Sequence, residues 1–252
     1  MVKIIALNTF KQLIRDKIAY SIFLLLIFAL TVSYFAGTIS LNQQIRLINS
    51  VMLSAFMLSV VIISLFIGAN IIERERRERL LFFVLTKPIS KTDYFIGKWL
   101  GVSIVIFLTF VLYVVSYAIL IKISGGSINI FSFTALAYVF FEGILLTAIA
   151  LTLSVWTKPI LAIIVFIMLY LIGHSSSLLL TIGEQLNNFA SYLLKALYYL
   201  LPNLEKFNLR NDVNYLSGYS NNEALSVIAY FVFYLILTLL IGVRVFNKRV
   251  FV

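Results

Sequence analysis

The sequence predicts an all-α membrane protein, and its composition and apolar pattern both support that fold class. Hydrophobic residues make up 62% of the 252-residue chain and charged residues only 12%, and the mean hydropathy is +1.05. A soluble domain carries about 25% charged residues. The apolar residues form six runs of about 22 residues, each long enough to cross a hydrocarbon core of roughly 30 Å as a helix. Backbone groups in lipid must bond within their own segment, so these runs are expected to be helices.

The six expected transmembrane helices belong to one domain over residues 1–252. The spans are expected at 18–39, 51–72, 99–121, 131–154, 159–181 and 223–245. Residues 1–17 come before them and place apolar side chains such as Ile5 and Leu13 near one helical face, with bases such as Lys11 on the other. This pattern predicts an interfacial helix lying flat on an anionic leaflet. An ordinary solvated amphipathic N-terminus is the alternative.

The distribution of basic residues predicts the orientation of the spans. Fifteen of the twenty lysines and arginines fall on the side of the two termini, which places both termini in the cytoplasm. The longest outer loop is then 182–222. Within it, 184–200 has an amphipathic helical pattern that stops before Pro202 and is too short to span. This segment is expected to be a re-entrant or interfacial helix on the outer face, and 208–222 to be a surface loop.

The most charged stretch lies between the second and third spans. Residues 73–98 hold seven of the twenty bases and four of the ten acids. Charges cost roughly 2.5–3.5 kcal/mol each at the centre of a membrane, so this stretch must face water. Yet the apolar run Leu81–Leu85 follows the charges directly. The combination predicts a short amphipathic element that lies against the membrane surface or a partner protein.

Several classes of function are excluded by what the sequence lacks. The net charge of +10 does not indicate nucleic-acid binding, because most of the bases border apolar runs. The chain has no cysteine, so it forms no disulfide and no thiolate metal site. One histidine is too little for a metal centre. No Gly-x-x-x-x-Gly-Lys-Ser/Thr motif is present to hold nucleotide phosphates. A membrane enzyme would need a clustered acid–base or metal constellation, and the sequence shows none.

The central loop and its flanks resemble those of ABC-2-type permeases, the membrane subunits of certain ATP-binding-cassette exporters. The matching segments are Ile72-Glu73-Arg74-Glu75, the apolar run Leu81 to Leu85, Lys87-Pro88-Ile89-Ser90-Lys91, and Gly97-Lys98. Relatives carry a Thr-Leu or Thr-Ile step before the apolar run, and this chain has Leu80 there. Leu201-Pro202-Asn203 and the segment 244–249 are similar more weakly.

The resemblance implies a half-transporter without cofactors of its own. Two subunits, expected to be identical, would pair in the plasma (inner) membrane of a prokaryote, and each would bind a cytoplasmic ATPase subunit that holds ATP and Mg²⁺. The cytoplasmic segment 74–91 would be the coupling helix that docks in the ATPase. The residues expected to dock are Arg74, Glu75, Arg77, Glu78, Phe82, Phe83 and Pro88.

A few polar residues within the spans are candidates for a transport pathway or for helix packing. Glu142 lies midway along the fourth span, and an acid at that depth is a functional hypothesis by default. His174 and Ser175 lie in the most polar part of any span. For Glu142 and His174, packing is the favoured interpretation. In the second span, small and hydroxyl residues share one helical face. These residues are Ser50, Ser54, Met57, Val61, Ser64 and Gly68.

The function expected from these features is ATP-driven export by a transport subunit that is not itself an enzyme. The alternative is an ATPase-linked membrane protein that serves signalling or metalloenzyme maturation without bulk transport. The small and apolar pathway candidates hint at an amphipathic or hydrophobic cargo, but the sequence does not identify it.

Overall fold

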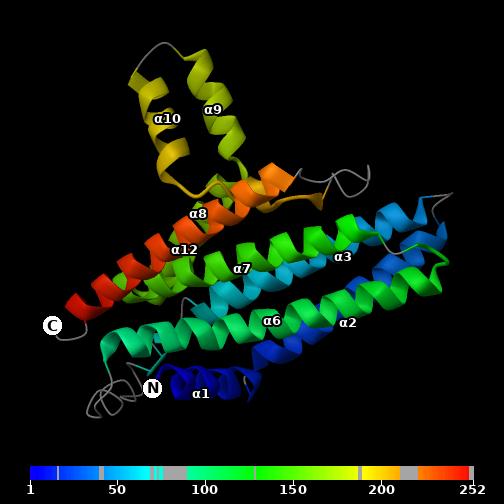
Figure 1. The fold of residues 1–252 in the computed structure, drawn as a ribbon, viewed down its shortest axis with the longest axis horizontal. Coiled ribbons are helices and arrows are strands. Elements are labelled where there is room, and N and C mark those ends of the chain that lie inside the picture. Colours follow the sequence, from blue (N-terminus) through cyan, green and yellow to red (C-terminus); the bar gives the residue numbers. More distant parts are fainter. Residues whose placement is uncertain are drawn as a thin grey trace.

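The structure is a computed structural model that describes residues 1–15, 17–39, 43–68, 71–72, 74–75, 90–127, 129–186, 189–210 and 221–249. The described residues are 92% helical and include no strand, which confirms the all-α fold class. Figure 1 shows an elongated bundle of long helices with a helical hairpin projecting from its side. Both termini lie at the end of the bundle where the helix α6 begins.

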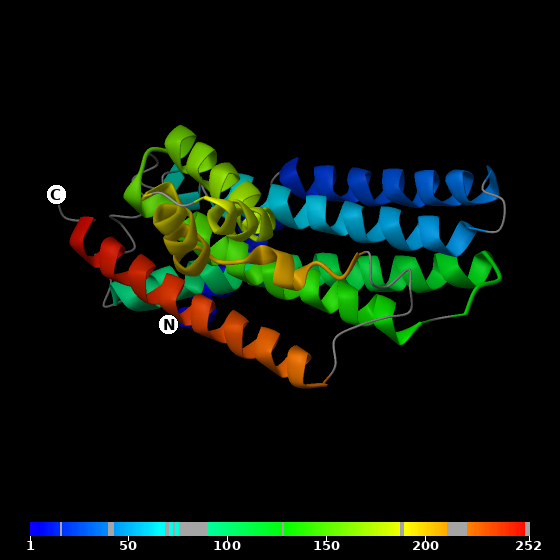
Figure 2. The same ribbon diagram turned by 90° about the horizontal axis from the view of Figure 1, so that it is seen from above.

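Eleven labelled elements make up the described part of the chain. They are α1 (Val2–Arg15), α2 (Lys17–Ile39), α3 (Gln44–Ile62), the π-helix η1 (Ile63–Gly68), α6 (Lys91–Ile123), α7 (Ile130–Trp156), α8 (Pro159–His174), α9 (Ser176–Gln185), α10 (Phe189–Leu200), the 3₁₀-helix η2 (Leu204–Phe207) and α12 (Asn221–Arg249). Figure 2 shows α2 beside α3, and α12 on the opposite side of the bundle, where it packs on α7.

Four described helices are long and apolar enough to cross a membrane. Their bounds are Gln44–Phe66, Lys91–Ile123, Ile130–Trp156 and Asn222–Lys248. The pair α8 and α9 adds a fifth crossing if it counts as one span. The chain is therefore a multi-pass membrane protein. The helix α2 coincides with the expected span at 18–39, but its apolar segment among the described residues is the shorter Phe23–Phe35. The span expected at 18–39, which would bring the total to six, therefore stays a prediction.

Local capping explains where two of the long helices begin. The Ser90 side chain accepts a hydrogen bond from the Asp93 backbone N–H at 3.0 Å and caps α6. The Asn129 side chain accepts one from the Phe131 N–H at 3.1 Å and caps α7. Asn and Ser satisfy N–H groups that have no partner within the first helical turn. These caps set the start of the helices that carry most of the core.

The helix α1 packs against the first half of α6. A Cβ atom on Gly97 would come within 2.8 Å of the Ile5 side chain, and one on Gly101 within 2.5 Å of Thr9 Cβ. Only glycine allows such a close approach between the two backbones. The buried face of α1, which includes Ile5, Thr9 and Leu13, is covered by protein, whereas Ile4, Leu7 and Ile14 are exposed. The interfacial position expected for residues 1–17 stays a prediction.

The fifth expected span is bent rather than straight. The helices α8 and α9 meet at Ser175 with a bend of 66°. The break lies in the polar run that begins at His174, whose side chain faces Glu142 and Glu205 inside the bundle. The helix expected over 184–200 is likewise split, since α9 ends at Gln185 and α10 begins at Phe189.

The segment that returns into the bundle is 201–210, after α10. Leu204, Phe207 and Leu209 are 1%, 0% and 3% exposed. The 3₁₀-helix η2 packs against α7 and α8. The surface loop expected over 208–222 is therefore wrong at its start, where Leu209 lies in the core. Burial of three large apolar side chains favours this position over one on the surface.

Candidate functional site

Most of the expected docking element lies outside the described residues. Arg77, Glu78, Phe82, Phe83 and Pro88 all belong to that part of the segment 74–91. Arg74 and Glu75 are described. Arg74 is exposed, whereas Glu75 is buried and only 5% exposed. A buried acid must be neutralised by partners, so the surroundings of Glu75 define the first candidate site.

Glu75 forms a buried cluster with Tyr94 and Lys98, which is named here the Glu75 cluster. The Tyr94 hydroxyl and the Lys98 ammonium both donate hydrogen bonds to the Glu75 carboxylate. Lys98 is 5% exposed and Tyr94 1%. The Tyr94 ring stacks on Phe246 of α12, with centroids 5.5 Å apart. The cluster therefore joins the beginning of the docking segment to α6 and α12. Sequence reasoning identified Glu75 but assigned no role to Tyr94.

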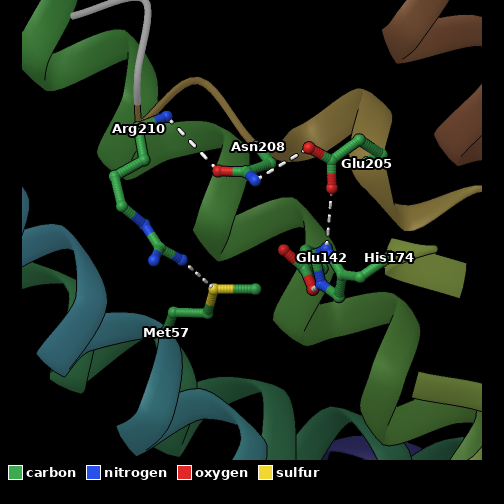
Figure 3. Close-up of polar contacts among 6 residues, drawn as sticks. All are labelled: Met57, Glu142, His174, Glu205, Asn208 and Arg210. Atoms are coloured by element: carbon green, nitrogen blue, oxygen red, sulfur yellow. Dashed lines mark hydrogen bonds and ion pairs between the residues drawn. The ribbon is translucent and has the colours of Figure 1, made fainter. Parts of the chain in front are cut away.

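A second, partly buried cluster lies halfway along the bundle and is named here the His174 cluster. It consists of Glu142, His174, Glu205, Asn208 and Arg210, shown in Figure 3. His174 Nε2 lies 2.8 Å from Glu142 Oε1, and His174 Nδ1 lies 3.2 Å from Glu205 Oε2. Glu142 comes from α7, His174 from the end of α8 and Glu205 from η2. The cluster thus holds the returning segment 201–210 against two helices.

Asn208 and Arg210 extend the His174 cluster toward α3. Asn208 Nδ2 donates to Glu205 Oε1 at 3.0 Å, and the Arg210 backbone N–H donates to Asn208 Oδ1 at 3.4 Å. The Arg210 guanidinium donates to Met57 Sδ at 2.9 Å. Met57 was a pathway candidate, and here it contacts the cluster through its sulfur.

The geometry at His174 requires one extra proton. Both ring nitrogens face carboxylate oxygens, but a neutral imidazole has only one N–H to donate. Both contacts are hydrogen bonds only if the ring is protonated or if one of the two acids carries a proton. In either case Glu142, His174, Glu205 and Arg210 together have no net charge. Charge balance of this kind offsets part of the penalty for burying ionised groups.

A narrow crevice adjoins Glu142. Its volume of about 10 Å³ is close to that of a single water site, and its lining includes Met57, Glu142, Asn208 and Arg210. Glu142 is 1% exposed, and its Oε2 atom has no hydrogen-bond partner among the described residues. An unpaired buried carboxylate oxygen is costly. The Glu142 carboxylate and the Arg210 guanidinium therefore line the same crevice, and the other lining residues are mostly apolar.

The remaining candidates on α3, on η1 and at the bend do not join either cluster. Ser64 is fully buried, and Ser54 donates to the Ser50 carbonyl at 2.6 Å. Ser175 is exposed at the bend between α8 and α9. These positions agree with either helix packing or a pathway, and both roles stay predictions.

Three members of the His174 cluster were missed by sequence reasoning. Glu205, Asn208 and Arg210 fall where a connection and a surface loop were expected. The signal that points to them is the interleaving of these polar residues with Leu204, Phe207 and Leu209, since such a pattern is typical of a segment with one buried face. Within the described residues, no group of three or more His, Cys, Asp or Glu side chains is arranged to hold a metal ion.

Comparison with known proteins identifies the family. A comparison with curated proteins returned no match. The model of the ABC-2 family transporter protein matches residues 3–250, which is nearly the whole chain. The match agrees with the apolar helices that can cross a membrane. The chain therefore belongs to the ABC-2 family of transporter proteins, in which it has the role of a membrane permease.

Proposed function

We propose that the chain is the permease subunit of an ABC-2-type exporter, and that a separate ATPase subunit drives it. The observation that carries the proposal is the family match over residues 3–250. The sequence has no phosphate-binding loop of its own. ATP and Mg²⁺ are accordingly assigned to the partner ATPase, and the role of this chain is to convert movements of the partner into movements of helices.

The docking element of this proposal is the segment 74–91. Both ends of the segment are attached to the bundle. Glu75 is held by Tyr94 and Lys98, and Lys91 Nζ donates to the Asn247 carbonyl of α12 at 3.1 Å. A force applied to the segment therefore reaches α6 and α12 directly. This attachment supports a coupling role better than a role as a loose surface loop.

The pathway of this proposal lies between two copies of the chain. One side of α8 exposes a row of large apolar side chains, of which Ile160 is 76% exposed and Leu171 58%. Such a row suits lipid or a second membrane subunit, and in a homodimer it would lie beside the pathway. The bend at Ser175 gives α8 and α9 a joint about which they can rearrange when α6 and α12 move.

The proposed orientation places both termini and the docking element in the cytoplasm, in the plasma membrane of a prokaryote. It is supported by the bias of basic residues and by the position of both termini at the end of the bundle where α6 begins. Single cysteines in place of Asn188 and Asn221 should react with an impermeant reagent added from outside. Reaction only from the cytoplasmic side would show that the topology is the reverse of the one proposed.

The coupling proposal is tested by co-purification with the partner ATPase. Alanine at Glu78, Phe82 and Phe83 together should abolish co-purification, because buried aromatic anchors often cost about 2–4 kcal/mol each when truncated. A matched control removes one acid and two aromatics from the projecting hairpin, at Glu184, Phe189 and Tyr192, which are all exposed. Undiminished co-purification of the first triple variant would remove the segment from the interface.

Transport itself requires a separate measurement. Proteoliposomes that contain the permease and its ATPase should show ATP-dependent export, and the Glu78, Phe82 and Phe83 variant should lose it. A complex that hydrolyses ATP but exports none of a panel of amphipathic solutes would favour the signalling or maturation role instead.

A further inference from the structure

The helix α12 contacts both the anchors of the segment 74–91 and the chain that returns into the bundle. It runs unbroken from Asn221 to Arg249 and contains no proline. It leads from the base of the projecting hairpin to the end of the bundle where both termini lie (Figure 1). Tyr230 and Phe246 lie about 24 Å apart along this helix, at 1.5 Å per residue.

At the docking end, α12 is attached to α6. The Phe246 ring is fully buried and stacks on Tyr94, with centroids 5.5 Å apart. Tyr94 also donates to Glu75, and Lys91 donates to a backbone carbonyl of α12 at 3.1 Å. These contacts connect the C-terminal part of α12 to both ends of the segment 74–91.

At the other end, two tyrosines of α12 hold the chain where it leaves α10. The Tyr230 hydroxyl accepts a hydrogen bond from the Asn203 backbone N–H at 2.6 Å. The Tyr234 hydroxyl donates to the carbonyls of Tyr199 and Leu201, at 3.3 and 3.4 Å. The two tyrosine rings lie 4.6 Å apart. This group of contacts, named here the tyrosine clasp, binds backbone atoms and therefore fixes the course of the chain at the start of the returning segment.

One ridge of α12 joins the docking end to the tyrosine clasp. Residues four apart line up along a helix as a ridge. The ridge consists of Tyr230, Tyr234, Thr238, Gly242 and Phe246. Thr152 of α7 donates to the Thr238 carbonyl at 3.2 Å. A Cβ atom on Gly242 would come within 2.4 Å of Phe95 Cζ in α6 and 2.6 Å of Thr152 Oγ1. The middle of the ridge is thus packed closely against two helices, which leaves little room for a local bend.

From this arrangement we infer that Tyr230 and Tyr234 are positioning residues that couple the docking end of α12 to the returning segment 201–210. When α12 moves at Phe246, the tyrosine clasp carries the start of the returning segment with it, and Glu205 moves relative to His174. The inference rests on the proposed function only where ATP is the source of the movement. The connection along α12 belongs to this chain alone and is testable without a partner.

The first test measures the labelling rate of a cysteine at position 203 in the purified full-length chain in neutral detergent. Asn203→Cys keeps the backbone N–H that bonds to Tyr230. Tyr230→Phe combined with Tyr234→Phe should raise the labelling rate about fivefold, which is the effect of losing about one net hydrogen bond. Tyr192→Phe, at an exposed site of the hairpin, is the control and should change the rate less than about 1.5-fold. An unchanged rate in the double variant would overturn the clasp.

A double-mutant cycle then tests the connection along α12. Phe246→Leu should raise the rate at position 203 about twofold when both tyrosines are present, and should not raise it after Tyr230→Phe with Tyr234→Phe, because the connection is then already broken. Phe233→Leu, at an exposed site of α12, should have no effect in either background. Equal effects of Phe246→Leu in both backgrounds, or no effect in either, would contradict the coupling.

A second cysteine distinguishes coupling from general unfolding. Ala162 of α8 is fully buried, and the labelling rate of Ala162→Cys should stay the same in all of these variants. A rise at positions 162 and 203 together would show that the substitutions loosen the whole bundle, and the inference would fall.

The last test uses the complex with the partner ATPase. Trapping a nucleotide with vanadate should change the labelling rate at position 203 at least about fivefold when both tyrosines are present, and should not change it in the Tyr230→Phe, Tyr234→Phe variant. An equal response in both forms, or none in either, would overturn the inference. Failure of the proposed function would differ, because the ATPase would then co-purify with neither form, and the double-mutant cycle on the chain alone would still decide the inference.

Discussion

Glu75 and Glu142 are both buried acids of the same bundle, but their partners differ. Glu75 accepts hydrogen bonds from a lysine and a tyrosine. Glu142 faces a histidine whose other nitrogen faces a second acid. Histidine changes its charge between about pH 5 and 8. The His174 cluster can therefore respond to protons, whereas the Glu75 cluster contains no histidine and joins the start of the segment 74–91 to α6 and α12.

The largest expected effect comes from removing the cation of the Glu75 cluster. Lys98→Met leaves Glu75 buried without a counter-charge and should lower the free energy of unfolding by about 3–5 kcal/mol. The measurement is unfolding in mixed micelles with increasing SDS. Lys122→Met makes the same chemical change at an exposed site of α6 and should change stability by less than about 0.5 kcal/mol. A similar loss in both variants would mean that the ion pair contributes nothing specific.

The next effect concerns the proton held by the His174 cluster. Glu142→Gln keeps the shape but removes one charge, and it should cost about 2 kcal/mol at pH 6, where a hydrogen bond between charged groups is lost. Raising the pH removes the shared proton and leaves two carboxylates facing one N–H donor. Stability of the unsubstituted chain should therefore fall as the pH rises above about 6.5, the ordinary pKa of histidine, and that of the variant should fall less. Parallel pH profiles of the variant and the unsubstituted chain would contradict a shared proton. Glu184→Gln, at an exposed position of α9, is the control.

A smaller effect is expected at Tyr94. Tyr94→Phe removes one of the two donors to Glu75 and leaves the ion pair and the stacking on Phe246 in place. The cost should be about 1 kcal/mol. The effect of Tyr94→Phe should also disappear in a chain that already carries Glu75→Leu with Lys98→Met, because leucine offers the Tyr94 hydroxyl no acceptor. Additive losses would show that the hydroxyl acts independently of the cluster.

The smallest effect is expected at Glu205, because its side chain is 42% exposed and solvent weakens its pairing with His174. Glu205→Gln should loosen the returning segment and raise the labelling rate of a cysteine placed at Asn203 by about two- to threefold, which corresponds to about 0.5 kcal/mol. The chain has no native cysteine, so the signal is specific. An unchanged rate would show that burial of Leu204 and Phe207 alone holds the segment.

Features of the fold that depend on local composition were predictable from the sequence. The runs expected at 99–121, 131–154 and 223–245 lie within α6, α7 and α12, because a run of about 20 apolar residues in a membrane must satisfy its backbone groups within its own helix. The boundaries were less predictable. α6 begins at Lys91 rather than 99, since the Ser90 cap and the contacts of Tyr94 and Lys98 extend the helix beyond its apolar part.

Features that depend on pairing across the chain were not predictable. Glu142 and His174 were recognised one at a time as costly residues in a membrane, but their contact joins positions in different helices. The break at Ser175 and the burial of Leu209 follow from that contact and from the return of 201–210 into the bundle. The sequence alone does not show which of several apolar helix faces will meet, so Glu205 was not recognised as a partner of His174.

The length of α6 has a mechanical consequence. Its 33 residues make a rod of about 50 Å, roughly 20 Å longer than the hydrocarbon layer. The rod contains no proline and no π-helical turn, unlike the α3–η1 helix, so it has no internal joint. Tilting it by about 5° around its middle swings each tip by about 2 Å in opposite directions. In a rod without a joint, a push on the Lys91 tip would be delivered as an opposite swing at the Ile123 tip.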